Sequence, residues 1–296
     1  MPWLVATLKL GPANVDTLTD ALLEAGALSV DVTDAWAGTP RESARFNEPG
    51  EPASPSWELA RIDALFDADA DVAAAVALAL ESAGYDPAQA CELNTVADRD
   101  WVRAVQADFK PVHVSPRLWV VPTWHQPPDP QAINLVIDPG LAFGTGTHPT
   151  TRLCLDWLDR HLQRGQRVLD YGCGSGILAI AAVKLGAAQA TAIDIDPAAV
   201  LAARDNAMQN QTAVEVEGAG HAITGSYDVV VANILANPLR LLAPLLARAT
   251  RAAGNIVLSG VLEHQAGEVL DAYREWFALE TSGREDGWVL LTGRRR

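Results

Sequence analysis

The sequence predicts an α/β protein in which a small α+β domain precedes a doubly wound parallel sheet. Three observations support this fold class. From residue 133 onward, apolar runs typical of buried strands alternate with helical patterns. Residues 167–176 pass from such a strand into a glycine turn that opens a helix. Residues 1–97 follow a different order, β-α-β-β-α-β, which is typical of a small ferredoxin-like domain.

The elements of the first domain follow from short local signals. Asn14 and Asp69 stand where a helix N-cap is expected, and Gly26 and Gly84 follow the two predicted helices as C-terminal glycines. The segment 41–56 is rich in Pro, Glu and Ser and is predicted to be a loop. The predicted elements are strands over 3–10, 27–32, 58–66 and 91–96, and helices over 15–25 and from Asp69 to about Gly84.

A proline-rich segment is expected to connect the two domains. A short helix is predicted over 98–108, and residues 109–130 then hold six prolines. Because proline lacks a backbone N–H and is disfavoured in helices and central strands, we expect a linker over 98–130, with only 118–121 extended. The predicted domains are therefore 1–97 and 131–296.

The second domain is predicted from its alternation of strand and helix patterns. The pair Asp286-Gly287 is typical of a tight hairpin turn, so the last strand is expected to run antiparallel to its predecessor. The predicted strands are 133–137, 167–171, 190–194, 213–216, 227–232, 254–261, 276–281 and 287–292, and the predicted helices are 150–163, 176–185, 197–210, 237–250 and 263–275.

The most informative motif is Asp170-x-Gly172-x-Gly174-x-Gly176. Glycines at these positions let the backbone turn tightly and approach a ligand where a Cβ would collide. The next predicted strand ends at Asp194, 22 residues after Gly172, and an acid there accepts ribose hydroxyls in nucleotide sites. The spacing differs from the G-x-G-x-x-G of dinucleotide folds. We expect Asp170 to face the same mouth, where a carboxylate would repel a pyrophosphate and attract an ammonium or sulfonium.

Two further segments carry candidate site residues. The glycine-rich segment 138–151 lacks the Gly-Lys-Ser/Thr of a phosphate-binding loop. Its His148 has no partner at metal-ligand spacing, so we expect a hydrogen-bonding loop residue and no metal site. The buried strand over 227–233 ends at Asn233, whose amide can both donate to and accept from a substrate amine or the cofactor's amino group.

Together the motifs resemble those of class I S-adenosylmethionine-dependent methyltransferases, and most closely the bacterial family that methylates the eleventh large-subunit ribosomal protein, the PrmA type. The resemblance covers nearly the whole chain. The segment after residue 232 departs from the Asn-Pro-Pro-Tyr of enzymes that methylate adenine bases and glutamine amides, which argues against those substrates. The matching segments are Gly-Thr-Gly-Thr-His-Pro-Thr-Thr at 144–151, Asp-Tyr-Gly-Cys-Gly-Ser-Gly-Ile-Leu-Ala-Ile at 170–180, Ile-Asp-Ile-Asp-Pro at 193–197 and Val-Ala-Asn-Ile-Leu-Ala at 231–236.

The resemblance implies a seven-stranded methyltransferase sheet and S-adenosylmethionine as the cofactor. It also implies trimethylation of lysine ε-amines and of the N-terminal α-amine of the large-subunit ribosomal protein, free or on the ribosome, with the first domain recognising this substrate. Asn233 is expected to position the reactants without a dedicated acid or base. Carried over residue by residue, the cofactor contacts fall on Thr151, Gly172, Asp194 and Asn233, with Phe143, Thr150 and Gly174 nearby.

Composition bounds the remaining function classes. The chain has 296 residues, 49% of them hydrophobic, as in soluble globular proteins. No apolar run reaches the roughly 20 residues of a membrane span, the start lacks a signal peptide's basic region, and the three cysteines lie far apart. These features predict a cytoplasmic protein with no membrane partner. A formal charge of −15 and a pI of 4.7 disfavour direct nucleic-acid binding; they suit a basic substrate or solubility alone.

Three rival functions stay open at this point. A nicotinamide-dependent dehydrogenase shares the nucleotide-type site but is disfavoured by the glycine spacing and by Asp170. A non-enzymatic cofactor-binding scaffold is disfavoured because the cofactor motifs accompany Asn233. A methyltransferase of small molecules or nucleic acids is the nearest rival.

Overall fold

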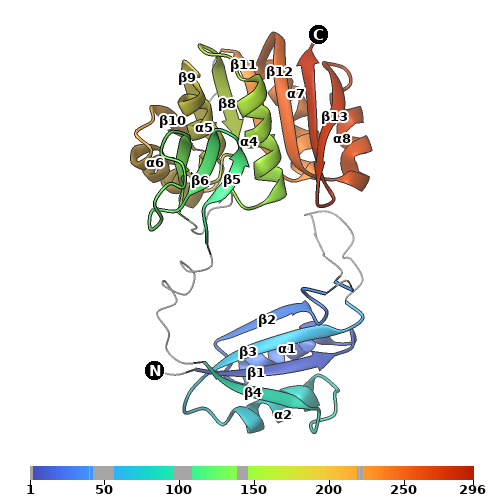
Figure 1. The fold of residues 1–296 in the computed structure, drawn as a ribbon. Helices are drawn as coiled ribbons and strands as arrows, with labels where there is room; N and C mark the ends of the chain where they lie inside the picture. The colour runs from blue at the N-terminus through green and yellow to red at the C-terminus, as the bar shows by residue number, and fades with distance from the viewer. Residues whose placement is uncertain are drawn as a thin grey trace. The chain divides into compact units, whose positions relative to one another are not determined.

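The structure is a computed structural model that describes residues 3–39, 41–42, 57–96, 109–138, 146–218, 220, 223 and 225–296. The chain divides into two compact units, Met1–Val105 and Gln106–Arg296 (Figure 1). Each unit has its own hydrophobic core and is considered by itself. The helix predicted over 98–108 lies outside the described residues.

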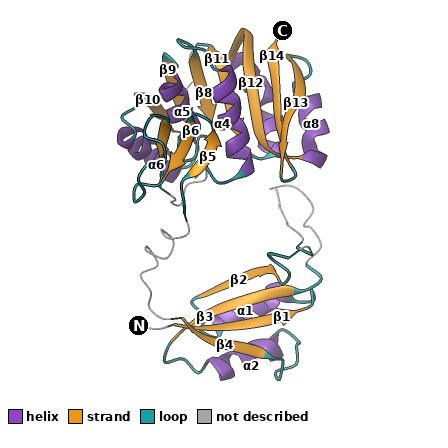
Figure 2. Cartoon of the chain, viewed as in Figure 1, coloured by secondary structure: helices purple, strands orange, loops and turns teal. Residues whose placement is uncertain are grey.

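The first unit is a four-stranded antiparallel sheet whose two helices cover one face (Figure 2). The strand order is β2-β3-β1-β4, so β2 and β4 form the two edges. The sequence predicted this order of elements along the chain; the ferredoxin-like assignment stays a prediction. The elements are β1 Trp3–Leu10, α1 Val15–Glu24, β2 Ser29–Asp34, β3 Ala60–Asp67, α2 Val72–Ser82 and β4 Cys91–Val96.

Of the two predicted helix caps of this unit, Asn14 lies at the predicted N-cap position but makes no side-chain capping bond, and Asp69 is wrong. Asn14 is left-handed, with φ 61°, and its side chain makes no capping bond; Nδ2 donates instead to the Ala83 carbonyl at 3.1 Å. The cap of α2 is Asp71, whose Oδ1 accepts from Ala74 N at 3.2 Å. Asp69 is too early for this role because β3 continues to Asp67 and a turn follows it.

The second unit is built on the predicted doubly wound seven-stranded sheet. Its order is β10-β9-β8-β11-β12-β14-β13, and all neighbours are parallel except β14, which is antiparallel to both β12 and β13. The expected terminal hairpin is therefore confirmed. The elements are α4 Pro149–His161, β8 Arg167–Tyr171, α5 Ile177–Leu185, β9 Gln189–Ile193, α6 Pro197–Gln209, β10 Val214–Glu217, β11 Tyr227–Asn233, α7 Ala236–Ala249, β12 Thr250–Leu262, η1 Glu263–Gln265, α8 Ala266–Tyr273, β13 Phe277–Glu285 and β14 Trp288–Arg295.

The linker predicted over 98–130 is wrong for its second part, residues 109–130. The strands β5 Val112–Ser115 and β6 Leu118–Val121 form a separate three-stranded sheet with β7 Ile133–Val136, which was expected in the larger sheet. Leu118 and Val120 are at most 2% exposed and share a core with α4 and α5. None of the six prolines lies inside a strand, since Pro111 precedes β5 and the others lie in the connections between β5, β6 and β7, so the apolar runs remain free to pair and pack.

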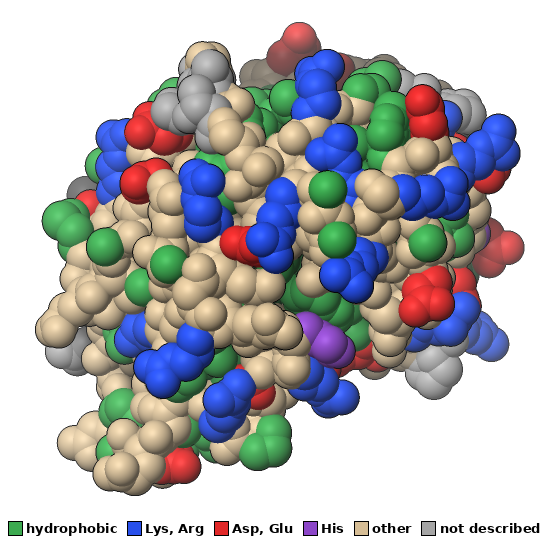
Figure 3. Space-filling view, turned by 90° about the horizontal axis from the view of Figure 1, so that it is seen from above, with side chains coloured by type: hydrophobic (Ala, Val, Ile, Leu, Met, Phe, Trp, Pro, Cys, Tyr) green, Lys and Arg blue, Asp and Glu red, His purple; other side chains and the backbone are tan. Residues whose placement is uncertain are grey.

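The larger sheet has two functionally different edges. The loops after β8, β9 and β11 leave the carboxyl edge, where ligands bind in folds of this kind. The opposite edge, here called the amino edge, is where β8, β11 and β12 begin and β14 ends. Figure 3 looks onto the amino edge, where Lys and Arg side chains gather. Within the described ranges, no helix combines the length and hydropathy needed to cross a bilayer.

Candidate functional site

The glycine turn after β8 depends on backbone that other residues rarely adopt. Gly172, Gly174 and Gly176 have φ of 73°, 53° and 76°, in the left-handed region that costs other L-residues free energy. A Cβ on Gly172 would lie 2.3 Å from Cγ2 of Ile234. The side chain of Ile234, the residue after Asn233, therefore packs in the space that the missing Cβ of Gly172 leaves.

Asp194 links the end of β9 to this turn. Its Oδ2 accepts from Gly174 N at 2.8 Å, and its Oδ1 accepts from Asp196 N at 3.0 Å. The carboxylate is half-buried and stays directed at the glycine turn. A carboxylate offers about four acceptor positions, so further acceptor capacity remains for ligand hydroxyls.

Asn233 and Thr151 meet at the end of β11. Asn233 Nδ2 donates to Thr151 Oγ1 at 3.4 Å, and Thr151 is fully buried. Asn233 Oδ1 is buried without a hydrogen-bond partner among the described residues. A buried acceptor without a hydrogen-bond partner costs free energy. This oxygen therefore indicates that a bound ligand donates a hydrogen bond to it.

His148 and Thr150 form the cap of α4. His148 Nδ1 accepts from Thr150 N at 3.3 Å and lies 2.7 Å from Thr150 Oγ1. Burial, and then the nearby Arg152 charge, lower the pKa of His148, which favours its neutral form. His148 is therefore the hydrogen-bonding residue that the sequence predicted. Thr150 is directed at this cap, whereas its neighbour Thr151 reaches Asn233.

Ile234 and Gly260 were missed by the sequence analysis. A Cβ on Gly260 would lie 2.4 Å from the Ile234 carbonyl oxygen, so the start of the loop after β11 is held between Gly260 and Gly172. This packing fixes the backbone that carries Asn233. An isolated glycine inside a strand is a signal of close backbone approach, and Gly260 within β12 was that signal.

The predicted orientation of Asp170 is wrong. Its side chain is completely buried beneath the turn, where Oδ2 accepts from Ala179 N at 3.1 Å. Its Oδ1 has no hydrogen-bond partner in the described part of the chain. Burial raises the pKa of Asp170 to about 7, and the charge of Asp194 adds to this, while the Ala179 bond opposes it. A sequence pattern places a residue on a strand but does not show which side of the turn its carboxyl occupies.

Replacing Asp170 by asparagine should change the pH dependence of stability. The folded protein keeps the Asp170 proton up to about pH 7, while the unfolded chain releases it near the ordinary value of 3.8. Between these values the folded state binds more protons, so the free energy of unfolding falls as pH rises. We expect wild type to lose up to about 1.4 kcal/mol per pH unit relative to Asp170→Asn in this range. Urea unfolding at a series of pH values checks this; parallel curves would contradict it.

The structure thus brings together most of the predicted site residues. Gly172, Gly174 and Asp194 form one group, and Thr151 and Asn233 form a second; Ile234 joins them by packing on Gly172. Phe143 lies outside the described residues. No cluster of three His, Cys, Asp or Glu side chains suited to a metal ion occurs in the ranges that the structure describes.

Comparisons with known proteins identify the family of this chain. A family model described as ribosomal protein L11 methyltransferase (PrmA) matches residues 2–296. Proteins named ribosomal protein L11 methyltransferase from Chromobacterium violaceum and Thiobacillus denitrificans are 52% and 51% identical to this chain; the alignments cover all of it and 99% and 100% of those proteins. A crystal structure of ribosomal protein L11 methylase from Lactobacillus delbrueckii subsp. bulgaricus has a TM-score of 0.58 and 34% identity, and the match covers 64% of this chain and 100% of that one. The chain therefore belongs to the ribosomal protein L11 methyltransferase (PrmA) family.

Proposed function

We propose that the protein transfers methyl groups from S-adenosylmethionine to ribosomal protein L11, trimethylating lysine ε-amines and the N-terminal α-amine in the cytosol. The observation that carries the proposal is the convergence of Asp194, the glycine turn and the orphaned Asn233 oxygen at one edge of the sheet. Membership of the family supports the choice of substrate.

The residues at this edge fit the cofactor. Asp194 has acceptor capacity for the ribose diol beyond its bonds to Gly174 and Asp196. The glycine turn exposes backbone to which the methionyl part can approach closely. The bound cofactor supplies an electrophilic methyl group on a sulfonium; everything else falls to the side chains that hold the two reactants in line.

The attacking amine must be neutral when it meets the methyl group. At pH 7 the deprotonation of a lysine costs about 4.6 kcal/mol, against about 1 kcal/mol for an α-amine, from their ordinary pKa values. Asn233 Oδ1 can accept an N–H of the neutral amine and so aim its lone pair. Because orientation alone supplies up to about 7–11 kcal/mol, we propose positioning and desolvation, without a dedicated acid or base.

Replacing Asp194 by alanine should weaken binding of S-adenosylmethionine. A hydrogen bond to a charged group contributes about 1.5–3 kcal/mol, so the dissociation constant should rise at least about tenfold. Isothermal titration calorimetry measures this directly. Asp196→Ala is the matched control, because Asp196 caps α6 through Ala198 N at 2.9 Å. Equal affinities of wild type and Asp194→Ala would remove Asp194 from the cofactor site.

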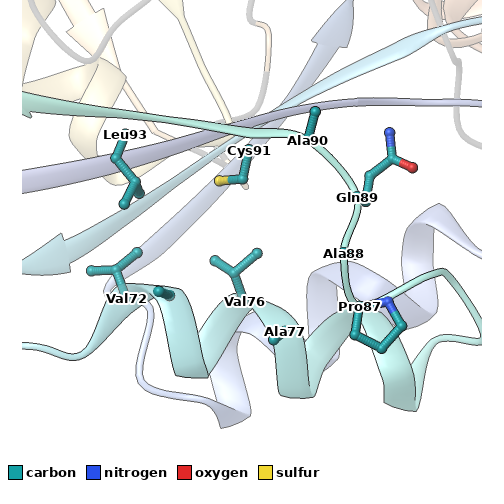
Figure 4. Close-up of a pocket in the computed structure, with 10 residues that line it drawn as sticks. Val72, Val76, Ala77, Pro87, Ala88, Gln89, Ala90, Cys91 and Leu93 are labelled. Atoms are coloured by element: carbon teal, nitrogen blue, oxygen red, sulfur yellow. The ribbon is translucent and has the colours of Figure 1, made fainter.

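The first unit has the charge expected of a surface that binds a basic substrate. Residues 1–105 contain six Lys and Arg against eighteen Asp and Glu, so they carry −12 of the formal −15. A groove of about 370 Å³ lies between α2 and the edge strand β4, with Val72, Val76 and Leu93 among its lining (Figure 4). Leu93 is 51% exposed. We infer that the substrate docks here, apolar side chains entering the groove and basic ones meeting the acids around it.

This docking surface predicts a selective change in KM. The variant Glu81→Gln/Asp86→Asn removes two acids next to the groove, one on α2 and one beside the lining residue Pro87, and should raise KM for L11 by about tenfold, with kcat and cofactor affinity unchanged. The control variant Asp16→Asn/Asp20→Asn removes the same charge from α1. Steady-state kinetics compares the two variants. An equal rise in KM in both would show that the overall charge of the unit, and not the groove, determines binding of L11.

The proposed function is tested by transfer of radiolabelled methyl groups. Wild-type protein, labelled cofactor and purified L11 should give labelled L11, and mass spectrometry should find three methyl groups on each modified amine. Parallel reactions with assembled large subunits and with free ribosomal RNA show which form is used. Label in RNA alone, or in neither, would overturn the proposal.

A further inference from the structure

The two units differ sharply in charge, and the second contains a basic face. Residues 106–296 hold sixteen Lys and Arg against nineteen Asp and Glu, close to neutrality. Nine of these basic residues lie where strands and helices meet the amino edge of the sheet, and we name this set the arginine edge. Figure 3 shows blue side chains spread across this face. The arginine edge consists of Arg160, Arg164, Arg167, Arg248, Arg251, Arg274, Arg294, Arg295 and Arg296.

Few acids oppose these arginines. In the segments 160–167, 225–228, 248–255, 274–278 and 292–296, the acidic residues are Asp228 and Glu275. From the neighbouring start of β10, Glu215 accepts from Gln189 Nε2 at 2.8 Å. Asp228 binds Arg251 at 2.7 Å, and two acids from preceding helical turns bind Arg160 and Arg274. Positive charge therefore remains in excess at this edge of an otherwise acidic protein.

Several guanidinium groups are held in place by neutral partners. Arg294 Nε donates to the Ala253 carbonyl at 2.8 Å, Arg295 donates to the Thr250 carbonyl, and Arg167 Nε donates to Gln189 Oε1 at 2.8 Å. Such bonds orient a guanidinium without neutralising it. Arg160 and Arg248 lie in last helical turns, where a cation complements the helix dipole. The helix dipole does not explain the arginines at strand ends, such as Arg167 and Arg294.

The composition of the face selects the class of partner. None of the exposed large apolar residues in the described chain belongs to the segments of the arginine edge. Protein interfaces need an apolar or aromatic centre, and surface binding to membranes needs an apolar face to insert. Arginine pairs with phosphate through two parallel N–H donors. The surface therefore suits a phosphate backbone, and RNA is the polyanion that surrounds a ribosomal protein.

We propose that the arginine edge binds the phosphate backbone of RNA. The face lies opposite the carboxyl edge that holds Asp194 and Asn233, so bound RNA leaves the methyl-transfer site open. Strand ends and helix ends present no element that enters a groove, so binding is independent of sequence and strongly salt-dependent. The expectation of no nucleic-acid binding rested on the net charge of the whole chain. That value averages the acidic first unit with the basic arginine edge of the second.

Fluorescence anisotropy with the full-length protein and a labelled RNA hairpin tests this proposal. The variant Arg164→Gln/Arg248→Gln/Arg296→Gln should bind at least about tenfold more weakly, and the slope of log Kd against log salt should fall by about three, one for each phosphate contact. The control variant Arg61→Gln/Arg240→Gln/Arg284→Gln changes the net charge equally away from this edge and should bind as wild type does.

Two further measurements make the result decisive. Methylation of free L11 by the arginine-edge variant should equal that of wild type, which shows that the variant is folded and separates this proposal from the proposed function. Anionic phospholipid vesicles and polyglutamate serve as competing ligands. Wild-type binding to either of these but not to RNA, or equal weakening by the two triple variants, would overturn the proposal.

Discussion

Replacing Asn233 by alanine should lower kcat for L11 methylation by about 10²–10³-fold, the range found when one preorganised hydrogen-bonding group is removed from a catalytic site. The expectation follows from the buried Oδ1, which has no partner among the described residues and lies at the end of β11 beside Thr151. If this oxygen orients the substrate amine, alanine at position 233 abolishes that orientation while the protein still folds. Steady-state kinetics with purified L11 gives kcat, and calorimetry gives cofactor affinity.

Asn237→Ala is the matched control for Asn233→Ala. Asn237 is the same residue type four positions later on α7, and its Oδ1 accepts from Arg240 Nη1 at 3.1 Å. Its loss should leave kcat within about twofold, the range of an ordinary surface change. Asn233→Ala with wild-type kcat would show that the orphaned oxygen does not meet the substrate.

Replacing Gly172 by alanine should both destabilise the second unit and weaken cofactor binding. The new Cβ would lie 2.3 Å from Ile234 Cγ2, on backbone with φ 73°. Left-handed strain costs about 1–2 kcal/mol, and overpacking adds about 1–3 kcal/mol. Because Ile234 follows Asn233 directly, we also expect about a 100-fold loss of affinity for S-adenosylmethionine, equivalent to about 2.7 kcal/mol. Urea unfolding and calorimetry measure the two effects.

Gly165→Ala separates strain from collision. Gly165 has φ 85°, but nothing lies within 4 Å of its Cβ position. It should therefore show the strain alone and retain cofactor affinity. The double variant Gly172→Ala/Ile234→Ala removes the colliding methyl and should recover part of the stability lost in Gly172→Ala. If Gly165→Ala and Gly172→Ala were equally destabilised, the packing of Ile234 would not matter.

Local sequence patterns predicted those parts of the site whose structure depends on residues close together in the chain. The strand into Gly172, the following helix and the acid at Asp194 each depend on neighbours along the chain, so local pattern was sufficient. Only the family resemblance placed Thr151 and Asn233 in one site, because 82 residues separate them and no local signal connects them; the hydrogen bond between them was not predicted.

The errors concern features that depend on distant parts of the chain. The segment 109–130 has the composition of a linker, and only packing against α4 and α5 explains why Leu118 is fully buried. Asp170 lies beneath the turn because Ala179 N, nine residues later, holds its carboxyl there. The sequence analysis also did not single out the arginine edge, because it combines five separate segments and the net charge conceals it.

The placement of β14 has a consequence for biosynthesis. This strand is inserted between β12 and β13, although it follows both of them in the chain. On a translating ribosome the first unit can fold early, because domains generally fold as units from the N-terminus. The seven-stranded sheet cannot be complete until β14 has left the exit tunnel, because β14 lies between β12 and β13, so the second unit finishes folding after the first.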